Sequence, residues 1–268
     1  MPDKKILILG CGNMGGAMLA GWLAAGLDPA RFTLVDPFLA EAPSGVKLLR
    51  EVPAGQFNTV LLGVKPQMID DAAQALASAI GPQTVVLSIL AGTEIASIAA
   101  RLPTAQAIVR IMPNLAAAIG KSPLGLFGSG LDVAGKTQLE QFLAPLGTLE
   151  WLASEAQLDA VTALAGSGPA FVYRFIDALA AGGAALGLDP AQAARLALTM
   201  VEGAANLAAQ ADAAPAELAA RVTSPGGTTA AGIAVLDRDR ALETLVSATL
   251  RAACERGAEL AAASRSSS

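Results

Sequence analysis

A glycine-rich segment near the amino terminus, Gly10-Cys11-Gly12-Asn13-Met14-Gly15, constrains the fold of this chain more than any other feature. It follows a short apolar run at 6–9 and opens a run with helical periodicity at 14–25. A G-x-G-x-x-G pattern is weak by itself, but between a strand and a helix it predicts a tight turn whose backbone approaches a dinucleotide pyrophosphate. The alternative is a glycine-rich turn in an α/β protein that binds no nucleotide.

Short β-branched runs alternate with helical runs through the first half of the chain. We expect strands at 5–9, 33–35, 59–64, 84–89 and 107–111, and helices at 14–25, 68–79 and 94–102. A weaker strand at 124–128 and a helix at 132–143 follow. Buried strands joined by helices are typical of a parallel sheet. Residues 1–153 are therefore predicted to form an α/β dinucleotide-binding Rossmann domain with a doubly wound, mostly parallel sheet.

The second half, residues 154–268, is rich in alanine and has helical periodicity throughout, so we expect an all-α domain there. An apolar stripe along this domain predicts at least a homodimer, unless the stripe packs within its own subunit; it comprises Ala241, Leu245, Ala248, Ala252 and Cys254. Hydrophobic residues are 53% of the chain and charged residues 15%, a balance that also suggests a surface covered by another subunit.

Composition excludes several functional classes. The chain has 0 histidines, which excludes Ser-His-Asp triads and dehydrogenases that use histidine as acid or base. A net charge of −5 argues against a nucleic-acid partner, and the apolar runs are too short for a membrane span. Cys11 and Cys254 have no metal-type spacing and suggest no disulfide framework, so we expect no metal site and a cytoplasmic location.

The loops that follow the predicted strands carry candidate cofactor contacts. Asp36 closes the second predicted strand, where a carboxylate accepts hydrogen bonds from a ribose hydroxyl and repels a 2′-phosphate. The basic residue nearest to Asp36 in the sequence, Arg31, lies before the strand and not after it. The pattern therefore favours NADH over NADPH. The alternative is that Asp36 begins a turn with Pro37. Lys65 ends another strand near the same edge, although it could equally be an ordinary solvated lysine.

Two further loops that follow predicted strands carry candidate ligand contacts. Residues 88–92 are mostly small, which lets a backbone approach a ligand. Met112 and Asn114 follow the next predicted strand and could face the nicotinamide, although a methionine there is more commonly part of the core.

The segment Ser224–Thr229 is the sharpest feature of the second half. Two glycines precede a helix that is expected to begin near Thr229, so consecutive backbone N–H groups could form an anion-binding nest aided by the helix dipole. The hydroxyls of Thr228 and Thr229 add groups that donate or accept hydrogen bonds. Such a loop would hold a carboxylate without arginine or lysine. The alternative is a linker capped by serine or threonine.

The chain resembles the pyrroline-5-carboxylate reductase family over nearly its whole length, through the segments GCGNMG, GVKPQ, SILAG, RIMPN, AGSGPAFVY and SPGGTT in that order. The resemblance implies an N-terminal Rossmann domain and an all-helical dimerisation domain, whose dimers often assemble into rings. It also implies the last step of proline biosynthesis, in which a hydride from NADH or NADPH adds to a cyclic imine that carries a carboxylate.

The resemblance also implies a role for each matching residue. Thr229 would be the catalytic residue and hydrogen-bond the ring nitrogen of the substrate. The implied substrate contacts are Ser224, Gly226, Gly227, Thr228, Thr229, Met112 and Asp212. Together with the candidates above, the cofactor contacts become Leu9, Gly10, Cys11, Gly12, Asn13, Met14, Gly15, Asp36, Val64, Lys65, Pro66, Leu90, Ala91, Gly92 and Asn114.

The chain departs from the family pattern at several places. Leu115-Ala116 stands where the family has Thr-Pro, and Ala219-Ala220 stands where it often has Lys-Asp. Asp212 takes the place of an acid that is usually glutamate.

Three other functions are alternatives, and the residues argue against the first and the third. A hydroxyacid dehydrogenase needs a lysine or histidine to exchange a proton with an alcohol, and no lysine follows Lys136. A reductase of a six-membered cyclic imine would share the same residues. A dimer that binds a dinucleotide without turnover would keep the glycine-rich loop but would not need the Ser224–Thr229 loop.

Overall fold

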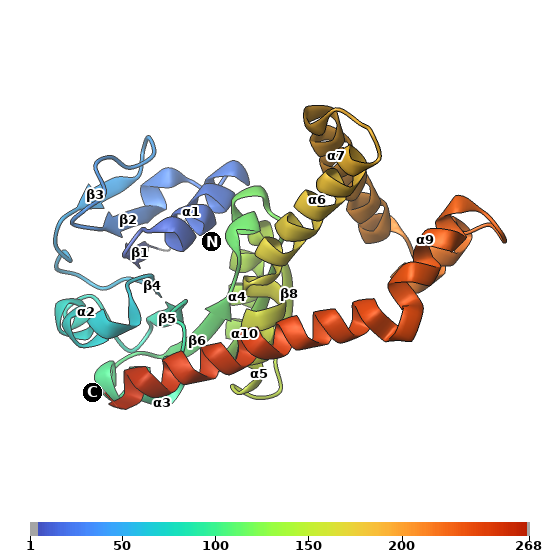
Figure 1. Ribbon diagram of the computed structural model, residues 1–268. Coiled ribbons are helices and arrows are strands. Elements are labelled where there is room, and N and C mark those ends of the chain that lie inside the picture. The colour runs from blue at the N-terminus through green and yellow to red at the C-terminus, as the bar shows by residue number, and fades with distance from the viewer. Residues whose placement is uncertain (1–4, 267–268) are drawn as a thin grey trace. The chain divides into compact units, whose positions relative to one another are not determined.

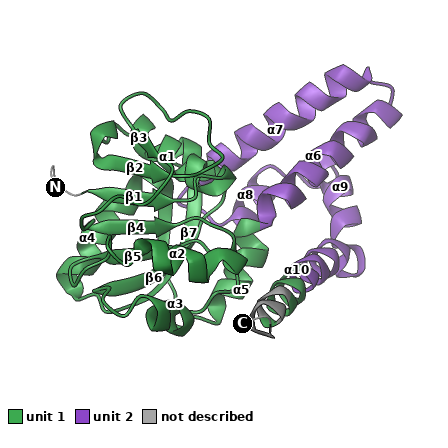
Figure 2. Cartoon of the chain, turned by 90° about the vertical axis from the view of Figure 1, so that its left-hand side faces the viewer, with its two compact units in different colours: residues 1–166, 253–268 green, residues 167–252 purple. Residues whose placement is uncertain are grey.

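The computed structural model describes residues 5–266. The chain divides into two compact units: Met1–Gly166 with Ala253–Ser268 form unit 1, and Ser167–Ala252 form unit 2 (Figure 2). The division at Gly166 falls at the end of a π-helical turn, Thr162–Gly166, beyond the domain boundary predicted after residue 153.

Unit 1 is built on an eight-stranded sheet with the order β3-β2-β1-β4-β5-β6-β7-β8 (Figure 1). Its strands are β1 (Ile6–Leu9), β2 (Phe32–Val35), β3 (Lys47–Leu49), β4 (Thr59–Leu62), β5 (Val85–Ser88), β6 (Ala107–Met112), β7 (Ser122–Ser129) and β8 (Gly147–Trp151). Neighbouring strands pair in parallel, except that β6 and β7 are antiparallel. The strand order reverses between β1 and β4, where a doubly wound sheet opens a crevice for a ligand.

Helices cover both faces of this sheet, which explains why β1 is buried along its whole length. The helices of unit 1 are α1 (Asn13–Ala24), α2 (Ile69–Leu76), α3 (Ile95–Arg101), α4 (Val133–Leu143) and α5 (Gln157–Val161). Side chains of β1 alternate between two cores: Ile6 and Ile8 pack with α1 and α4, and Leu7 and Leu9 pack with α2 and α3.

Trp22 of α1 anchors the first of these cores. Its side chain is fully buried, and its ring stacks on Phe142 with centroids 4.6 Å apart and on Phe32 at 5.7 Å. The indole Nε1 donates to the carbonyl of Phe142 at 2.8 Å, so the polar edge of the ring is satisfied.

The α/β fold predicted from the sequence is confirmed. The predicted strands and helices of the first half are present, with bounds that differ by a few residues. The sequence patterns missed β3 and β8, and they underestimated β7, which extends over Ser122–Ser129.

Unit 2 is helical, as predicted. It contains α6 (Gly168–Ala185), α7 (Pro190–Gln210), α8 (Pro215–Arg221), α9 (Thr228–Asp237) and the first half of α10 (Ala241–Ser266). Helices α6 and α7 lie side by side (Figures 1 and 2). Asp189 caps α7, because its Oδ1 accepts a hydrogen bond from the Gln192 amide at 3.0 Å.

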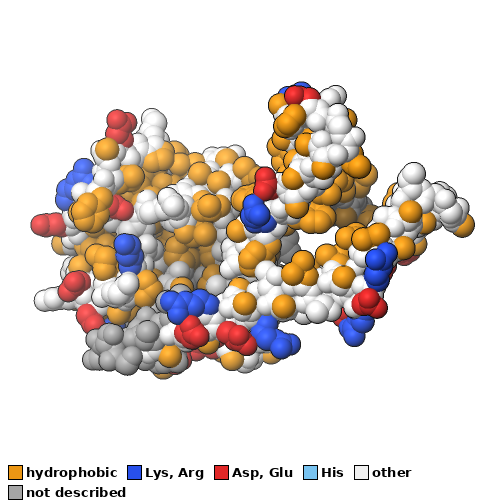
Figure 3. Space-filling model, in the orientation of Figure 1, with side chains coloured by type: hydrophobic (Ala, Val, Ile, Leu, Met, Phe, Trp, Pro, Cys, Tyr) orange, Lys and Arg blue, Asp and Glu red, His pale blue; other side chains and the backbone are white. Residues whose placement is uncertain are grey.

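The helices of unit 2 leave many apolar side chains uncovered within one chain. No residue of α6 or α9 is buried, and the buried residues of α7 are Ala193 and Ala197. Figure 3 shows hydrophobic side chains over these helices. The large exposed ones include Val172, Tyr173, Phe175, Leu196, Leu198, Met200, Leu207, Val235, Leu242, Leu245 and Val246.

Candidate cofactor and substrate sites

The glycine-rich loop lies at the carboxyl end of β1, at the point where the strand order reverses. Gly10 has φ +84°, and a Cβ there would lie 2.9 Å from the carbonyl of Gly63 and from the Val64 amide nitrogen, so only glycine fits. Gly12 differs, because a Cβ built on it meets no heavy atom within 4 Å. Its open side leaves room for a ligand to approach the backbone, as a pyrophosphate does at this position.

Asp36 holds the glycine-rich loop from the end of β2. Its Oδ2 accepts a hydrogen bond from the Cys11 amide at 2.8 Å, and its Oδ1 accepts from the amides of Phe38 at 2.8 Å and Leu39 at 3.1 Å. The carboxylate therefore fixes two loops at once. Asp36 does begin a turn with Pro37, which was the alternative interpretation of this residue. Its contact with a ribose stays a prediction.

Burial raises the pKa of the Cys11 thiol to about 11, and the nearby charge of Asp36 adds to the effect. Cys11 is therefore protonated at neutral pH and unsuited to nucleophilic chemistry.

Arg50 is the residue near this edge that sequence reasoning missed. Its Nη1 donates to the carbonyls of Asp36 at 2.8 Å and Leu39 at 2.7 Å. Arg31 is the nearest basic residue in the sequence, but β3 pairs with β2 and brings Arg50 beside Asp36 instead. Arg50 also lines a cavity of about 260 Å³ that reaches Leu9 and Gly10. A guanidinium at this place suits an anionic group on the adenosine end of a dinucleotide.

The loops after β4 and β5 lie at the same carboxyl edge of the sheet. Lys65 precedes the short helical turn Pro66–Met68, and its side chain is exposed, as both interpretations of it require. In the next loop Leu90 is buried, with its amide donating to Ser88 Oγ at 3.3 Å, and Ala91 is exposed. Gly92 has φ +69°, so this loop turns sharply before α3.

Asn114 lies after β6 with both ends of its side-chain amide engaged. Its Oδ1 accepts from the Ala116 amide at 2.9 Å, and its Nδ2 donates to the carbonyl of Ala165 at 3.0 Å, within the π-helical turn. Asn114 therefore supports the fold around the predicted nicotinamide end, and its contact with the cofactor stays a prediction. Met112 is half-buried beside the same turn, where a Cβ on Gly166 would lie 3.8 Å from its sulfur.

The Ser224–Thr229 loop leads directly into α9 in unit 2. Gly227 is the N-cap, and no side chain caps the helix, so the alternative of a serine or threonine cap is wrong. Gly226 has φ +71°, and the Gly227 amide donates to the Ser224 carbonyl at 3.0 Å. The first amides of a helix have no intrahelical acceptor. Because Thr228 and Thr229 are exposed, these amides and hydroxyls can receive an anion.

Asp212 lies in the exposed loop between α7 and α8, also in unit 2. Met112 and every predicted cofactor contact belong to unit 1, whereas the Ser224–Thr229 loop and Asp212 belong to unit 2.

Among the described residues 5–266, no helix combines the length and apolar character needed to cross a membrane. In the same part of the chain, no group of three or more Cys, Asp or Glu side chains is arranged to hold a metal ion.

Two family models match this chain. One, described as pyrroline-5-carboxylate reductase dimerisation, matches residues 155–260; the other, described as NADP oxidoreductase coenzyme F420-dependent, matches residues 5–92. The pyrroline-5-carboxylate reductase of Pseudomonas aeruginosa is 37% identical and aligns over 97% of this chain and 98% of its own. That of Methanosarcina acetivorans is 34% identical over 97% of this chain and 99% of its own.

Solved structures are similar over the same extent. The pyrroline-5-carboxylate reductase of Coxiella burnetii has a TM-score of 0.88 and 31% identity, covering 96% of this chain and 98% of its own. The Plasmodium falciparum pyrroline carboxylate reductase, crystallised with NADP bound, has a TM-score of 0.80 over 97% of this chain and 99% of its own. At 22% identity, it shows that the fold is shared.

Proposed function

The chain belongs to the pyrroline-5-carboxylate reductase family, and we propose that it reduces 1-pyrroline-5-carboxylate to L-proline with NADH or NADPH. The observation that carries this proposal is the uncapped start of α9, where exposed threonine hydroxyls follow a glycine N-cap. This arrangement suits a substrate that bears both a carboxylate and a ring nitrogen.

The residues of unit 1 fit a dinucleotide. The open side of Gly12 leaves space for a pyrophosphate, and Gly10 allows the close turn that brings the backbone to it. When bound, the reduced nicotinamide supplies the hydride that adds to the imine carbon.

The residues of unit 2 are proposed to bind and orient the substrate. The amides that begin α9, with the hydroxyls of Ser224 and Thr228, hold the carboxylate. The Thr229 hydroxyl hydrogen-bonds the ring nitrogen. Because a protonated imine is already electrophilic, the protein needs to supply orientation rather than a strong acid, which agrees with the absence of histidine from the sequence. Asp212 and Met112 stay predictions as further substrate contacts.

Pre-steady-state kinetics of Thr229→Ala would test this proposal. We expect the hydride-transfer rate with 1-pyrroline-5-carboxylate to fall by about 10-fold to 1,000-fold, because a hydrogen bond to the reacting group is lost. Thr229→Ser, which retains a hydroxyl, is the matched control and should keep most of the rate. A wild-type chain that oxidises neither cofactor with this substrate would refute the function, and turnover with the six-membered imine instead would redirect it.

Cofactor choice depends on two residues with opposite effects. The charge of Asp36 disfavours a 2′-phosphate and favours NADH, as the sequence predicts. Arg50, which lines the adjoining cavity, provides a guanidinium that a 2′-phosphate could contact. We therefore infer that the enzyme accepts both cofactors, and that Arg50 weakens the preference for NADH.

We also propose that the chain acts as a homodimer and that its dimers form a ring. The exposed apolar side chains of unit 2, such as Tyr173 at 67% and Phe175 at 49%, support the dimer, since such surface is usually covered in a stable protein. Light scattering would measure the mass of the assembly directly. A cytoplasmic location is part of the same proposal, because the thiols of Cys11 and Cys254 are free.

A further inference from the structure

An ion pair between the buried Arg110 and the half-buried Glu155 joins three segments of unit 1. Arg110 of β6 donates from Nη1 to Glu155 Oε1 at 2.8 Å, and the Arg110 side chain is 7% exposed. The same Oε1 accepts a hydrogen bond from the Ile95 amide at 2.8 Å. One carboxylate oxygen therefore links β6, the first residue of α3 and the segment that leads into α5.

Glu155 caps the start of α3, because it accepts the hydrogen bond of the Ile95 amide although it lies 60 residues later in the sequence. Glu94, the N-cap residue of α3, makes no side-chain capping bond. The first amides of a helix need an acceptor from outside, and a carboxylate there also interacts favourably with the helix dipole. Arg110 in turn keeps the carboxylate of Glu155 in place, because the guanidinium is buried and its charge needs a partner.

The segment held in this way is the loop between β5 and α3, residues 89–94. It contains Leu90, Ala91 and Gly92, which are three of the predicted cofactor contacts. β5 fixes one end of this loop through the sheet, and Glu155 fixes the other end through Ile95. A small displacement of such a loop would misplace the reacting ring, although neither charged side chain belongs to the predicted set of cofactor contacts.

We propose that Arg110 and Glu155 are positioning residues that hold the loop 89–94 in the geometry required for hydride transfer; this inference rests on the proposed function. They act through the Ile95 amide. The pair thus sets the affinity for the reduced cofactor and the rate of the chemical step, but not the affinity for the imine.

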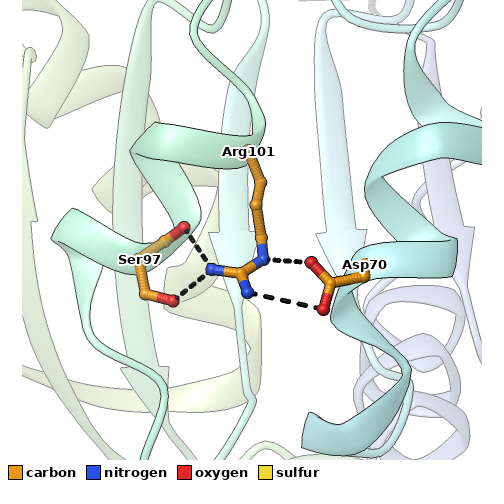
Figure 4. A network of polar contacts seen from close by, with 3 residues as sticks. All are labelled: Asp70, Ser97 and Arg101. Atoms are coloured by element: carbon orange, nitrogen blue, oxygen red, sulfur yellow. Dashed lines mark hydrogen bonds and ion pairs between the residues drawn. The ribbon is translucent and has the colours of Figure 1, made fainter. Parts of the chain in front are cut away.

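A second ion pair on α3 provides a matched control (Figure 4). Arg101, the last residue of α3, donates from Nε to Asp70 Oδ1 at 2.6 Å and from Nη1 to Ser97 Oγ at 2.8 Å. This pair is more exposed, with 23% of the Arg101 and 68% of the Asp70 side chain accessible. It joins α3 to α2 at the end of the helix that lies away from the loop 89–94.

The experiment compares five variants with the wild type. Glu155→Leu removes the acceptor for Ile95, Glu155→Gln keeps a neutral acceptor, and Arg110→Met removes the cation that holds Glu155. Because Glu155→Leu leaves Arg110 buried without a partner and could prevent folding, the double variant Arg110→Met/Glu155→Leu replaces the pair with two apolar side chains. Arg101→Met is the control.

Three measurements are made on each folded variant. Calorimetric titration with NADH gives a cofactor Kd that needs no turnover. Steady-state kinetics with 1-pyrroline-5-carboxylate give kcat and both KM values. Hydrogen exchange of peptides covering residues 89–98 reports directly on the Ile95 amide.

For Arg110→Met, Glu155→Leu and the double variant, we expect the Kd for NADH to rise by about tenfold and kcat to fall by about 10-fold to 100-fold. The KM for the imine should stay within about twofold, and exchange should rise in residues 89–98 but not throughout the unit. Glu155→Gln should retain more activity, and Arg101→Met should behave as the wild type. The double variant should match Glu155→Leu, since both remove the acceptor of the Ile95 amide.

The opposite results would overturn the inference. Variants that melt at lower temperature but keep the wild-type Kd and kcat would show that the pair only stabilises the fold. An equal effect in Arg101→Met would show that any ion pair on α3 matters. If instead wild type binds NADH but does not reduce the imine, the proposed function fails, while Kd and hydrogen exchange still test the positioning role.

Discussion

Replacing Gly12 with alanine should weaken cofactor binding while leaving the fold nearly unchanged. Gly12 has φ −68°, which any L-residue adopts, and a Cβ there meets no heavy atom within 4 Å. Because Gly12 is the N-cap of α1, where alanine is less suitable than glycine, we expect a stability loss of about 0.5–1 kcal/mol. The space that the methyl group fills is the space a pyrophosphate needs.

The size of the binding effect follows from the geometry. Phosphate oxygens hydrogen-bond loop amides at about 2.9 Å, a distance that leaves no room for an added methyl group. Forcing an extra carbon into such a contact costs about 1–3 kcal/mol, because the loop or the ligand must shift. The Kd for NADH should therefore rise by about 5-fold to 150-fold.

Calorimetric titration with NADH and urea unfolding, run on the same preparations, would measure both quantities. Gly16→Ala is the matched control, since it lies within α1 and its Cβ would be an ordinary 4.0 Å from the Cys11 carbonyl oxygen. It should raise the free energy of unfolding by about 0.5–1 kcal/mol, because alanine favours a helix interior, without changing the Kd. A Gly12→Ala variant that binds NADH within about twofold of the wild type would refute this interpretation of the loop.

Three further perturbations test other parts of unit 1. Arg50→Met should raise the KM for NADPH by about tenfold and that for NADH by less than about threefold, and equal changes in steady-state assays would exclude a 2′-phosphate contact. The pKa of Cys11 rises on folding from 9.0 to about 11, so the contribution of Cys11 to the free energy of unfolding should be constant below pH 9 and fall by roughly 2–3 kcal/mol toward pH 11. Urea titrations between pH 9 and pH 11 should show a steeper fall of the free energy of unfolding with pH in the wild type than in Cys11→Ala. Equal pH dependence in the two proteins would contradict the raised pKa of Cys11. Trp22→Phe should lower the free energy of unfolding by about 2–3 kcal/mol, because it opens a cavity and leaves the Phe142 carbonyl without its donor; a loss below about 1 kcal/mol would show that the core repacks.

The sequence predicted the central strands well because burial on both faces leaves a strong signature. β1, β4 and β5 are runs of branched apolar residues, and each is buried along nearly its whole length. β3 carries no such signature: it has three residues, and Lys47 at its start is exposed. β8 alternates half-buried and exposed side chains at the edge of the sheet, where propensity says little.

The sequence predicts those parts of the candidate site whose ligand-binding groups lie in one continuous segment. The loop from Gly10 and the Ser224–Thr229 loop are such segments, and the structure gives each a backbone geometry suited to a ligand. Partners that come from distant segments left no local pattern. Arg110 and Glu155 lie in different elements, and their link to the Ile95 amide exists only in the folded chain.

Arg50 shows why one acidic residue after β2 is an incomplete guide to cofactor choice. β3 pairs in parallel with β2 and sets Leu49 opposite Val35, so the residues that follow them, Asp36 and Arg50, lie side by side although 14 positions apart. The carboxylate of Asp36 accepts from three amides, and the Arg50 Nη1 donates to two carbonyls that carry no full charge. The guanidinium charge therefore offsets that of Asp36 at the edge of the cavity, and a 2′-phosphate meets a weaker repulsion than Asp36 alone would impose. The predicted preference for NADH therefore depends on the balance of the two charges, which is why Arg50→Met should change the ratio of the two KM values.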